Sequence, residues 1–142
     1  MIIQGHFIGD APYFAAHLKA IHFEGFVWFL ADTGASRTIL LDRDLRLLKV
    51  PSQALEPALL SVTGIGGSVR SFAIGRVKLT FASDEGEMVL QRDLSVVQHD
   101  LDRMPPEEVS RILRLPSILS RDLINLFQFR CNYQSGIVQL ER

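Results

Sequence analysis

Cysteine is nearly absent from this chain. Cys131 is the only one among 142 residues, so an internal disulfide and a cluster of thiolate metal ligands are both excluded. Its neighbours Phe127, Phe129 and Tyr133 are aromatic, and this setting predicts a buried cysteine that behaves as a small hydrophobic side chain. We therefore expect a structural role for Cys131.

The chain also lacks an excess of charge of one sign. It carries 15 Lys and Arg against 16 Asp and Glu, for a formal net charge of −1, without a basic stripe or an acidic tail. Since nucleic acids and anionic membranes recruit basic surfaces, neither is expected as a partner. The histidines are scattered without the spacing of a metal site, so we expect no metal and no other cofactor. They are His6, His17, His22 and His99.

Long hydrophobic runs are missing too. No stretch reaches the roughly 18 apolar residues that a bilayer span requires. The segment Met1–Asp10 has no Lys or Arg ahead of its short apolar run, unlike a secretory signal. We therefore expect a cytoplasmic protein.

Apolar residues are nevertheless abundant, and most of them alternate with polar ones. With 47% hydrophobic residues over 142 positions, a single domain spanning residues 1–142 is expected. Alternation and turn residues predict strands at 13–23, 26–31, 37–41, 59–63, 68–81, 88–97, 129–133 and 137–140. Turns are predicted at 24–25, 64–67, 83–86 and 134–136, and short helices at 43–48 (with Asp42 as N-cap), 105–113 and 121–127. The expected fold class is mostly β with two or three short helices.

The segment Phe29–Leu40, FLADTGASRTIL, interrupts an apolar strand with Asp32, Thr33 and Gly34 and then becomes apolar again. Cleaving an amide with water needs an acid and a base at the same time. Two carboxylates roughly 3 Å apart meet this need because they share one proton, so that one is charged and the other neutral. The chain has no second Asp-Thr-Gly or Asp-Ser-Gly. A carboxylate pair therefore requires a C2 homodimer, which brings Asp32 of each copy to the axis.

Three segments in this order resemble the retropepsins, the retroviral-type aspartic peptidases. Phe29–Ser36 looks like the catalytic loop of that family, and Thr63–Ser68, TGIGGS, looks like its Gly-rich flap. Leu115–Leu123, LPSILSRDL, is similar to its second apolar motif and the helix that follows. The resemblance implies a closed β-barrel with one lobe per chain, working as a homodimeric aspartic endopeptidase on peptide or protein substrates.

The resemblance also implies a role for each matched residue. Asp32 is the expected catalytic residue, while Thr33 and Gly34 hold the two loops together across the axis. Substrate binding is expected from Ala35 and from the flap residues Gly64, Ile65, Gly66 and Gly67. Structural support is expected from Ser36, Ile118, Leu119, Ser120, Arg121 and Asp122.

Two positions depart from the family pattern. Ser120 stands where the second motif usually has a glycine, and its added Cβ and hydroxyl are expected either to shift Asp32 or to add a hydrogen bond. Ser36 stands where many viral members have an aspartate that pairs with the arginine of the helix. Arg121 therefore needs another partner, and the adjacent Asp122 is one candidate.

Other interpretations of these segments stay open. Asp-x-Gly often caps its own turn through the Asp side chain. A phosphate loop at 64–67 lacks the following Lys-Ser or Lys-Thr, and Ser36 lacks the second glycine of a nucleophile elbow, so both are disfavoured. The alternatives kept are a catalytically inactive dimeric peptide-binding module with the same fold and a domain excised from a longer protein.

Overall fold

The computed structural model describes residues 1–58 and 69–142. Its strands are β1 (Ile2–Gln4), β2 (His6–Ile8), β3 (Ala11–Lys19), β4 (Glu24–Ala31), β5 (Ile39–Leu40), β6 (Glu56–Pro57), β7 (Val69–Ser83), β8 (Gly86–His99), β9 (Ile118–Leu119), β10 (Gln128–Asn132) and β11 (Ile137–Glu141). The helices are α1 (Asp42–Leu47), α2 (Pro106–Ile112) and α3 (Arg121–Ile124), with 3₁₀ turns η1 (Ser52–Ala54) and η2 (Leu101–Arg103). The expected strand at 59–63 and the turn at 64–67 lie outside the described residues. Within the described ranges, no helix is long and apolar enough to cross a membrane.

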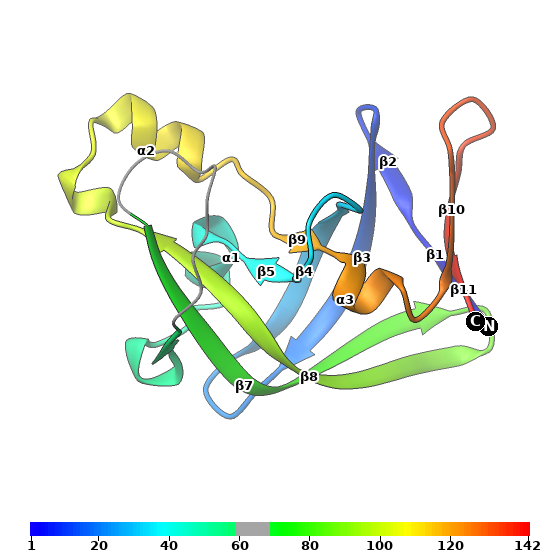
Figure 1. The fold of residues 1–142 in the computed structure, drawn as a ribbon, viewed down its shortest axis with the longest axis horizontal. Coiled ribbons are helices and arrows are strands. Elements are labelled where there is room, and N and C mark those ends of the chain that lie inside the picture. The colour runs from blue at the N-terminus through cyan, green and yellow to red at the C-terminus, as the bar shows by residue number, and fades with distance from the viewer. Residues whose placement is uncertain (59–68) are drawn as a thin grey trace.

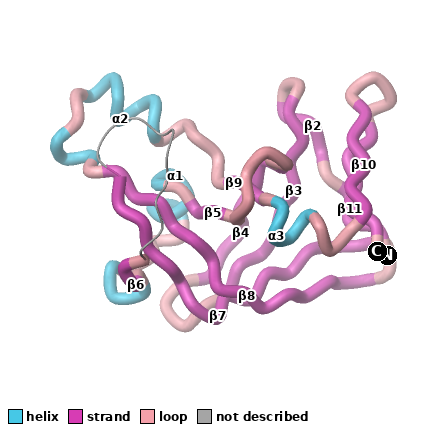
Figure 2. Tube along the Cα trace, viewed as in Figure 1, coloured by secondary structure: helices cyan, strands magenta, loops and turns pink. Residues whose placement is uncertain are grey.

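The strands form two sheets (Figures 1 and 2). The larger has the order β2-β3-β4-β9-β5-β8-β7-β6, and an additional pairing of β3 with β7 closes six of its strands into a barrel. The smaller sheet, β1-β11-β10, brings both chain termini together at one end of the molecule. The expected mostly β, closed-barrel fold with short helices is confirmed.

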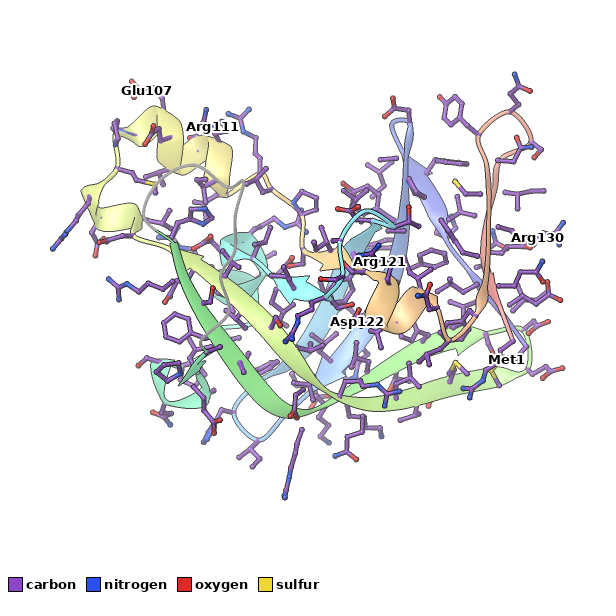
Figure 3. All side chains as sticks on the ribbon, in the orientation of Figure 1. Met1, Glu107, Arg111, Arg121, Asp122 and Arg130 are labelled. Atoms are coloured by element: carbon purple, nitrogen blue, oxygen red, sulfur yellow. The ribbon has the colours of Figure 1, made fainter. Side chains whose placement is uncertain are left out.

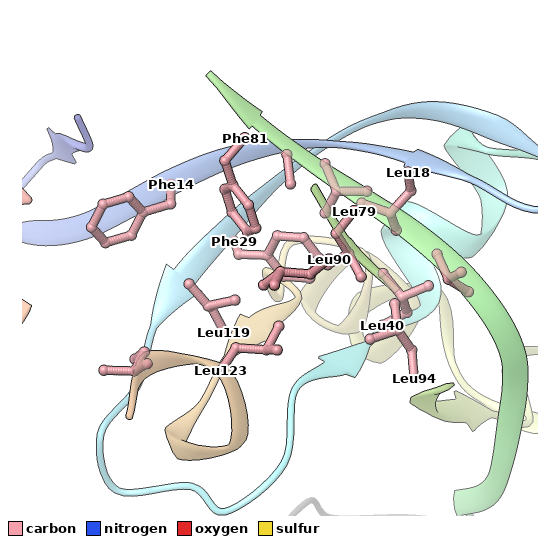
Figure 4. Packing of buried hydrophobic residues seen from close by; sticks show 14 of the residues in the cluster. Phe14, Leu18, Phe29, Leu40, Leu79, Phe81, Leu90, Leu94, Leu119 and Leu123 are labelled. Atoms are coloured by element: carbon pink, nitrogen blue, oxygen red, sulfur yellow. The ribbon is translucent and has the colours of Figure 1, made fainter. Parts of the chain in front are cut away.

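The hydrophobic core fills the barrel (Figure 4). Along β4 the side chains alternate, so that Val27 and Phe29 point inward and are buried while Phe26 and Trp28 are exposed. Phe29 packs in one cluster with Leu79 of β7 and Leu119 of β9, and all three are 0% exposed. Burying such side chains contributes roughly 1.5–3 kcal/mol each, and the core therefore holds β4 and β9 against the β7–β8 ribbon.

The expected turns at 83–86 and 134–136 are confirmed, but the one at Glu24-Gly25 is wrong. The chain reverses at residues 20–23, where the Ala20 N–H donates to the Phe23 carbonyl at 2.9 Å. Gly25 instead lies inside β4, where an added Cβ would stand only 2.6 Å from Cδ2 of Leu48. The glycine therefore permits close packing of the segment after α1 and does not make a turn.

Three further expectations need correction. Asp42 is the first residue of α1 and not its N-cap, which is Leu41. The helix expected at 121–127 ends at Ile124. Cys131 is exposed rather than buried, because β10 lies at the edge of the small sheet, outside the barrel.

Asp42 has a different structural role from capping. Its Oδ1 accepts a hydrogen bond from the His99 backbone N–H at 2.8 Å, and its Oδ2 lies 2.5 Å from Nδ1 of the His99 ring. The side chains of Asp42 and His99 are 3% and 0% exposed. His99 is the last residue of β8 and pairs with Val69, the first residue of β7. This buried pair therefore ties α1 to the end of the β7–β8 ribbon.

We expect Asp42→Ala to lower the free energy of unfolding by about 3 kcal/mol, because the change leaves two buried polar groups of His99 without their acceptor. Denaturant titration at one fixed protein concentration measures the loss. Asp102→Ala, at an exposed position in η2, is the matched control and should be neutral within about 0.5 kcal/mol. Equal stability of the two variants would contradict this role.

Candidate active site

Strand β9 lies between β4 and β5 and organises the site. It pairs in parallel with β4, through Leu30 with Ile118 and Ala31 with Leu119, and antiparallel with β5 through Ile118 and Ile39. The chain therefore leaves β4, forms the loop 32–38, and returns as β5 on the other side of β9 (Figure 1). The strands β5 and β9 can hold this arrangement although each is short, because Leu119 is fully buried and anchors β9 in the core.

Asp32 is the first residue after β4. Its backbone N–H donates to the Leu119 carbonyl at 2.9 Å, which continues the pairing with β9. Its Oδ1 accepts the Gly34 N–H at 2.9 Å, so the side chain caps its own turn, as Asp-x-Gly commonly does. Thr33 and Gly34 are exposed at the tip of this loop, whereas Asp32 is partly buried.

Gly34 keeps the turn compact. A Cβ at this position would lie 3.1 Å from Oδ1 of Asp32, which is tighter than ordinary van der Waals contact. Any larger residue would therefore press on the carboxylate that Gly34 itself holds. The close approach favours glycine on the exposed side of the turn.

The far end of the loop is held by Asp122. Thr38 donates to this carboxylate through its backbone N–H at 3.0 Å and through its hydroxyl at 2.7 Å. The Thr38 hydroxyl oxygen in turn accepts the Ser120 N–H at 3.1 Å. Thr38 and Ser120 are buried, at 1% and 0% exposure, while Asp122 is exposed, so these bonds connect the buried end of the loop to the start of α3.

A second polar brace lies before β9. The Ser117 hydroxyl donates to Asp44 at 2.6 Å and accepts the Leu41 N–H at 2.9 Å. Asp44 also pairs with Arg43 at 3.1 Å. Ser117 and Asp44 are buried, and the Ser117 carbonyl accepts the Leu30 N–H at 2.9 Å. β9 is therefore fixed by polar contacts on both sides of Ile118 and Leu119.

The Ser120 side chain does not separate β9 from the loop, since the Asp32 N–H still donates a hydrogen bond to the Leu119 carbonyl. Its hydroxyl finds no hydrogen-bond partner within the described residues. Of the two expected effects of Ser120, an added hydrogen bond from its side chain is thus not found there. Its backbone N–H, by contrast, is part of the Thr38 contact.

Of the other residues expected to give structural support, Arg121 and Asp122 bond to the loop, whereas the Ser36 side chain makes no such bond. The Arg121 backbone N–H donates to the Ala35 carbonyl at 3.2 Å, and Asp122 faces Thr38 rather than Arg121; Figure 3 labels both helix residues. Ser36 is exposed, and its side chain makes no hydrogen bond with the described part of the chain. The flap residues expected to bind substrate, Gly64, Ile65, Gly66 and Gly67, lie outside the described residues.

Sequence reasoning missed Thr38, Ser117 and Asp44. Each is a common polar residue, and its role depends on a contact between the segment around β5 and α1 and the segment around β9, which lie 73 to 84 positions apart along the chain. Two signals were available in the sequence. Thr38 lies two positions after the Asp32 motif, and Ser117 precedes the apolar pair of the second motif.

Within the described residues, the hydrogen bonds of Asp32 run to its own turn and to β9, and none joins it to another carboxylate. One carboxylate can take or give a proton but cannot do both in one step. Each chain therefore presents one Asp32 carboxylate, whose position is set by its own turn and by β9.

The comparison with solved structures bears on this geometry. A retropepsin-like aspartic protease from Rickettsia conorii matches with a TM-score of 0.58 and 21% identity, covering 99% of this chain and 88% of that one. The EIAV protease complexed with the inhibitor HBY-793 matches with a TM-score of 0.52 and 17% identity, over 83% of this chain and 88% of that one. The chain has a retropepsin-like fold.

A third match extends the range of proteins that share this fold. The retroviral protease-like domain of Ddi1 from Leishmania major has a TM-score of 0.56 and 12% identity, over 95% of this chain and 91% of that one. No protein-family model and no curated protein sequence matches the chain. The retropepsin-like likeness thus rests on backbone architecture, and it confirms the resemblance first drawn from three sequence segments.

We expect Asp122→Ala to release the end of the loop, because the buried Thr38 N–H and hydroxyl lose their charged acceptor. The cost should be about 2 kcal/mol of unfolding free energy, with faster hydrogen exchange at the Thr38 amide. Asp122→Asn keeps one acceptor oxygen and is the matched control, with a smaller effect on both. A Thr38 amide that exchanges as slowly in Asp122→Ala as in the unmodified chain would contradict this role.

Proposed function

We propose that this chain is a homodimeric aspartic endopeptidase that hydrolyses peptide bonds with a water molecule held between two Asp32 carboxylates. The supporting observation is the position of Asp32, which follows β4 and is bonded through its N–H to β9 in a retropepsin-like fold. A second copy is required because each chain supplies one such carboxylate.

The proposed reaction uses one proton shared by the two carboxylates. The charged Asp32 takes a proton from water while the water oxygen forms a bond to the peptide carbonyl carbon, and the neutral Asp32 donates its proton to the carbonyl oxygen. To break the C–N bond, the newly protonated Asp32 donates its proton to the leaving nitrogen, and the other Asp32, now charged, takes a hydroxyl proton as the new carboxyl group forms. Hydrolysis by this route needs neither a metal nor a covalent intermediate.

The remaining loop residues support the pair. Thr33 and Gly34 are exposed at the tip of the loop, where a hydroxyl and a residue without Cβ suit contact with the same loop of a second copy. We assign Ala35 and the segment Gly64–Gly67 to substrate binding. An extended peptide there would be held by main-chain hydrogen bonds, with alternate side chains in pockets. Residues 1–142 would act as one such domain, in the cytoplasm.

The alternative is a catalytically inactive dimeric module that binds peptides. Ser120 is the observation that favours it, because its buried hydroxyl has no partner in the described residues and the residue directly follows Leu119, whose carbonyl accepts the Asp32 N–H. A mixed peptide library, incubated with and without a statine-type transition-state mimic, separates the two. Cuts that the mimic suppresses support the peptidase, and binding without cuts supports the module.

We expect Asp32→Asn to abolish cleavage while leaving the fold intact. The amide oxygen of Asn can still accept the Gly34 N–H, but the side chain neither takes up nor releases a proton, and the loss should be at least about 10³-fold in kcat. Peptide cleavage measures the activity, and circular dichroism with thermal unfolding measures the fold. Asp102→Asn, an exposed position, is the matched control and should retain full activity. An active Asp32→Asn variant would refute the assignment.

The rate of cleavage should be greatest at mildly acidic pH. Because the pair works with one proton, activity should fall at high pH, where both carboxylates are charged, and also at low pH, where both are neutral. The measurement is kcat/KM as a function of pH with a peptide that has no titratable side chains. A rate that rises continuously into the alkaline range would point to a different base.

A further inference from the structure

Arg121, at the start of α3, has no charged partner within the described residues. None of the ion pairs within residues 1–58 and 69–142 includes it. Ser36 carries no charge, and the carboxylate of Asp122 is bonded to Thr38 instead. Arg121 is exposed beside the Asp32 loop (Figure 3), so its guanidinium group is available to another molecule.

Arg37 is a second exposed arginine in the same place. It lies on the Asp32 loop itself, five positions after Asp32, and it too is absent from the ion pairs of the described chain. Thr38, the next residue, is 1% exposed, whereas Arg37 is exposed. The loop therefore buries one side chain and leaves the neighbouring guanidinium group in solvent.

Backbone hydrogen bonds fix both arginines relative to Asp32. The Asp32 N–H donates to the Leu119 carbonyl at 2.9 Å, and the Arg121 N–H donates to the Ala35 carbonyl at 3.2 Å. The loop and the start of α3 therefore lie side by side, and each of them carries one of the two arginines. We call Arg37 and Arg121 the arginine pair.

The arginine pair makes the surroundings of Asp32 positive once the proposed carboxylate pair holds its shared proton. Two copies of the chain bring four such arginines to the site. Against them stand two Asp122 carboxylates and a single negative charge on the Asp32 pair. A surplus of positive charge attracts negatively charged groups, and guanidinium groups bind carboxylates through N–H donors in a fixed fork.

We propose that Arg37 and Arg121 select peptide substrates with acidic side chains next to the bond that is cleaved. The inference rests on the proposed function and names the class of peptide on which that site acts. An Asp or Glu of the substrate supplies the carboxylate that Arg121 lacks in its own chain.

The two-fold symmetry of the proposed dimer sharpens this inference. An axis that relates the two Asp32 residues also places one arginine pair on each side of them. An extended peptide that crosses the axis meets the same two guanidinium groups before and after the cleaved bond. Acidic residues should therefore be enriched on both sides of the cleavage sites found in a mixed peptide library.

Matched peptides measure the preference. In one cleaved sequence, Glu and Gln at the enriched position differ in charge but hardly in shape. At about pH 5.5, where substrate carboxylates are charged, we expect kcat/KM to be at least about fivefold higher for the Glu peptide, as for a well-placed exposed ion pair. The ratio should fall as salt is added, because salt screens exposed charges.

Variants of the arginine pair assign the preference to these residues. Arg37→Gln and Arg121→Gln should each lower the ratio, and the double variant should bring it to about one. The matched control is Arg92→Gln, at an exposed position of β8, which should leave the ratio unchanged. The double variant Arg37→Glu with Arg121→Glu should prefer a Lys peptide over the Gln peptide. A gained preference of this kind cannot result from misfolding.

Binding of the same peptides to Asp32→Asn reports recognition without cleavage and separates the two proposals. Equal rates and equal dissociation constants for the Glu and Gln peptides overturn the role of the arginine pair and leave the peptidase intact. A Glu preference that persists in the double Gln variant overturns that role as well. Tighter binding of the Glu peptide without cleavage by the unmodified chain supports the arginine pair and overturns the peptidase. Neither binding nor cleavage of any library peptide overturns both.

Discussion

The position of Asp32 depends on one backbone contact, the bond from its N–H to the Leu119 carbonyl. A loop of polar and small residues has little to hold it in one conformation, since ordering each residue costs roughly 1–2 kcal/mol of backbone entropy. Here the strand that receives the loop is itself locked, because Leu119 is buried in the barrel. The core thus fixes the loop indirectly, by fixing its partner strand.

The polar braces around β9 explain why two residues are enough for a strand in this place. Ser117 bonds to Asp44 and Leu41 on one side, and Thr38 bonds to Asp122 and Ser120 on the other. Buried polar groups are costly when unpaired and rigid when fully paired. The loop from Asp32 to Thr38 is therefore held at both ends while its tip, at Thr33 and Gly34, stays exposed.

In the small sheet, too, most strand edges are covered by neighbouring elements. Both edges of β11 are covered, because it pairs with β1 and with β10, and Asp84 covers the outer edge of β1 through Ile2. The remaining edge belongs to β10.

Local sequence features determined much of this protein. Alternating apolar residues specified the strands, as in β4, and the turn residues at 83–86 and 134–136 specified two hairpins. The Asp-Thr-Gly and Leu-Pro-Ser-Ile-Leu segments indicated the fold through their resemblance to the retropepsins, and the structure places them at the end of β4 and at β9. These features depend on neighbours along the chain, which a sequence displays directly.

Tertiary structure decided the rest. Gly25 lies in a strand because Leu48 packs against it, Asp42 bonds to His99 across 57 positions instead of capping a helix, and Cys131 is exposed because β10 is an edge. In each case the residue type allows several roles, and only the element that packs against it selects one.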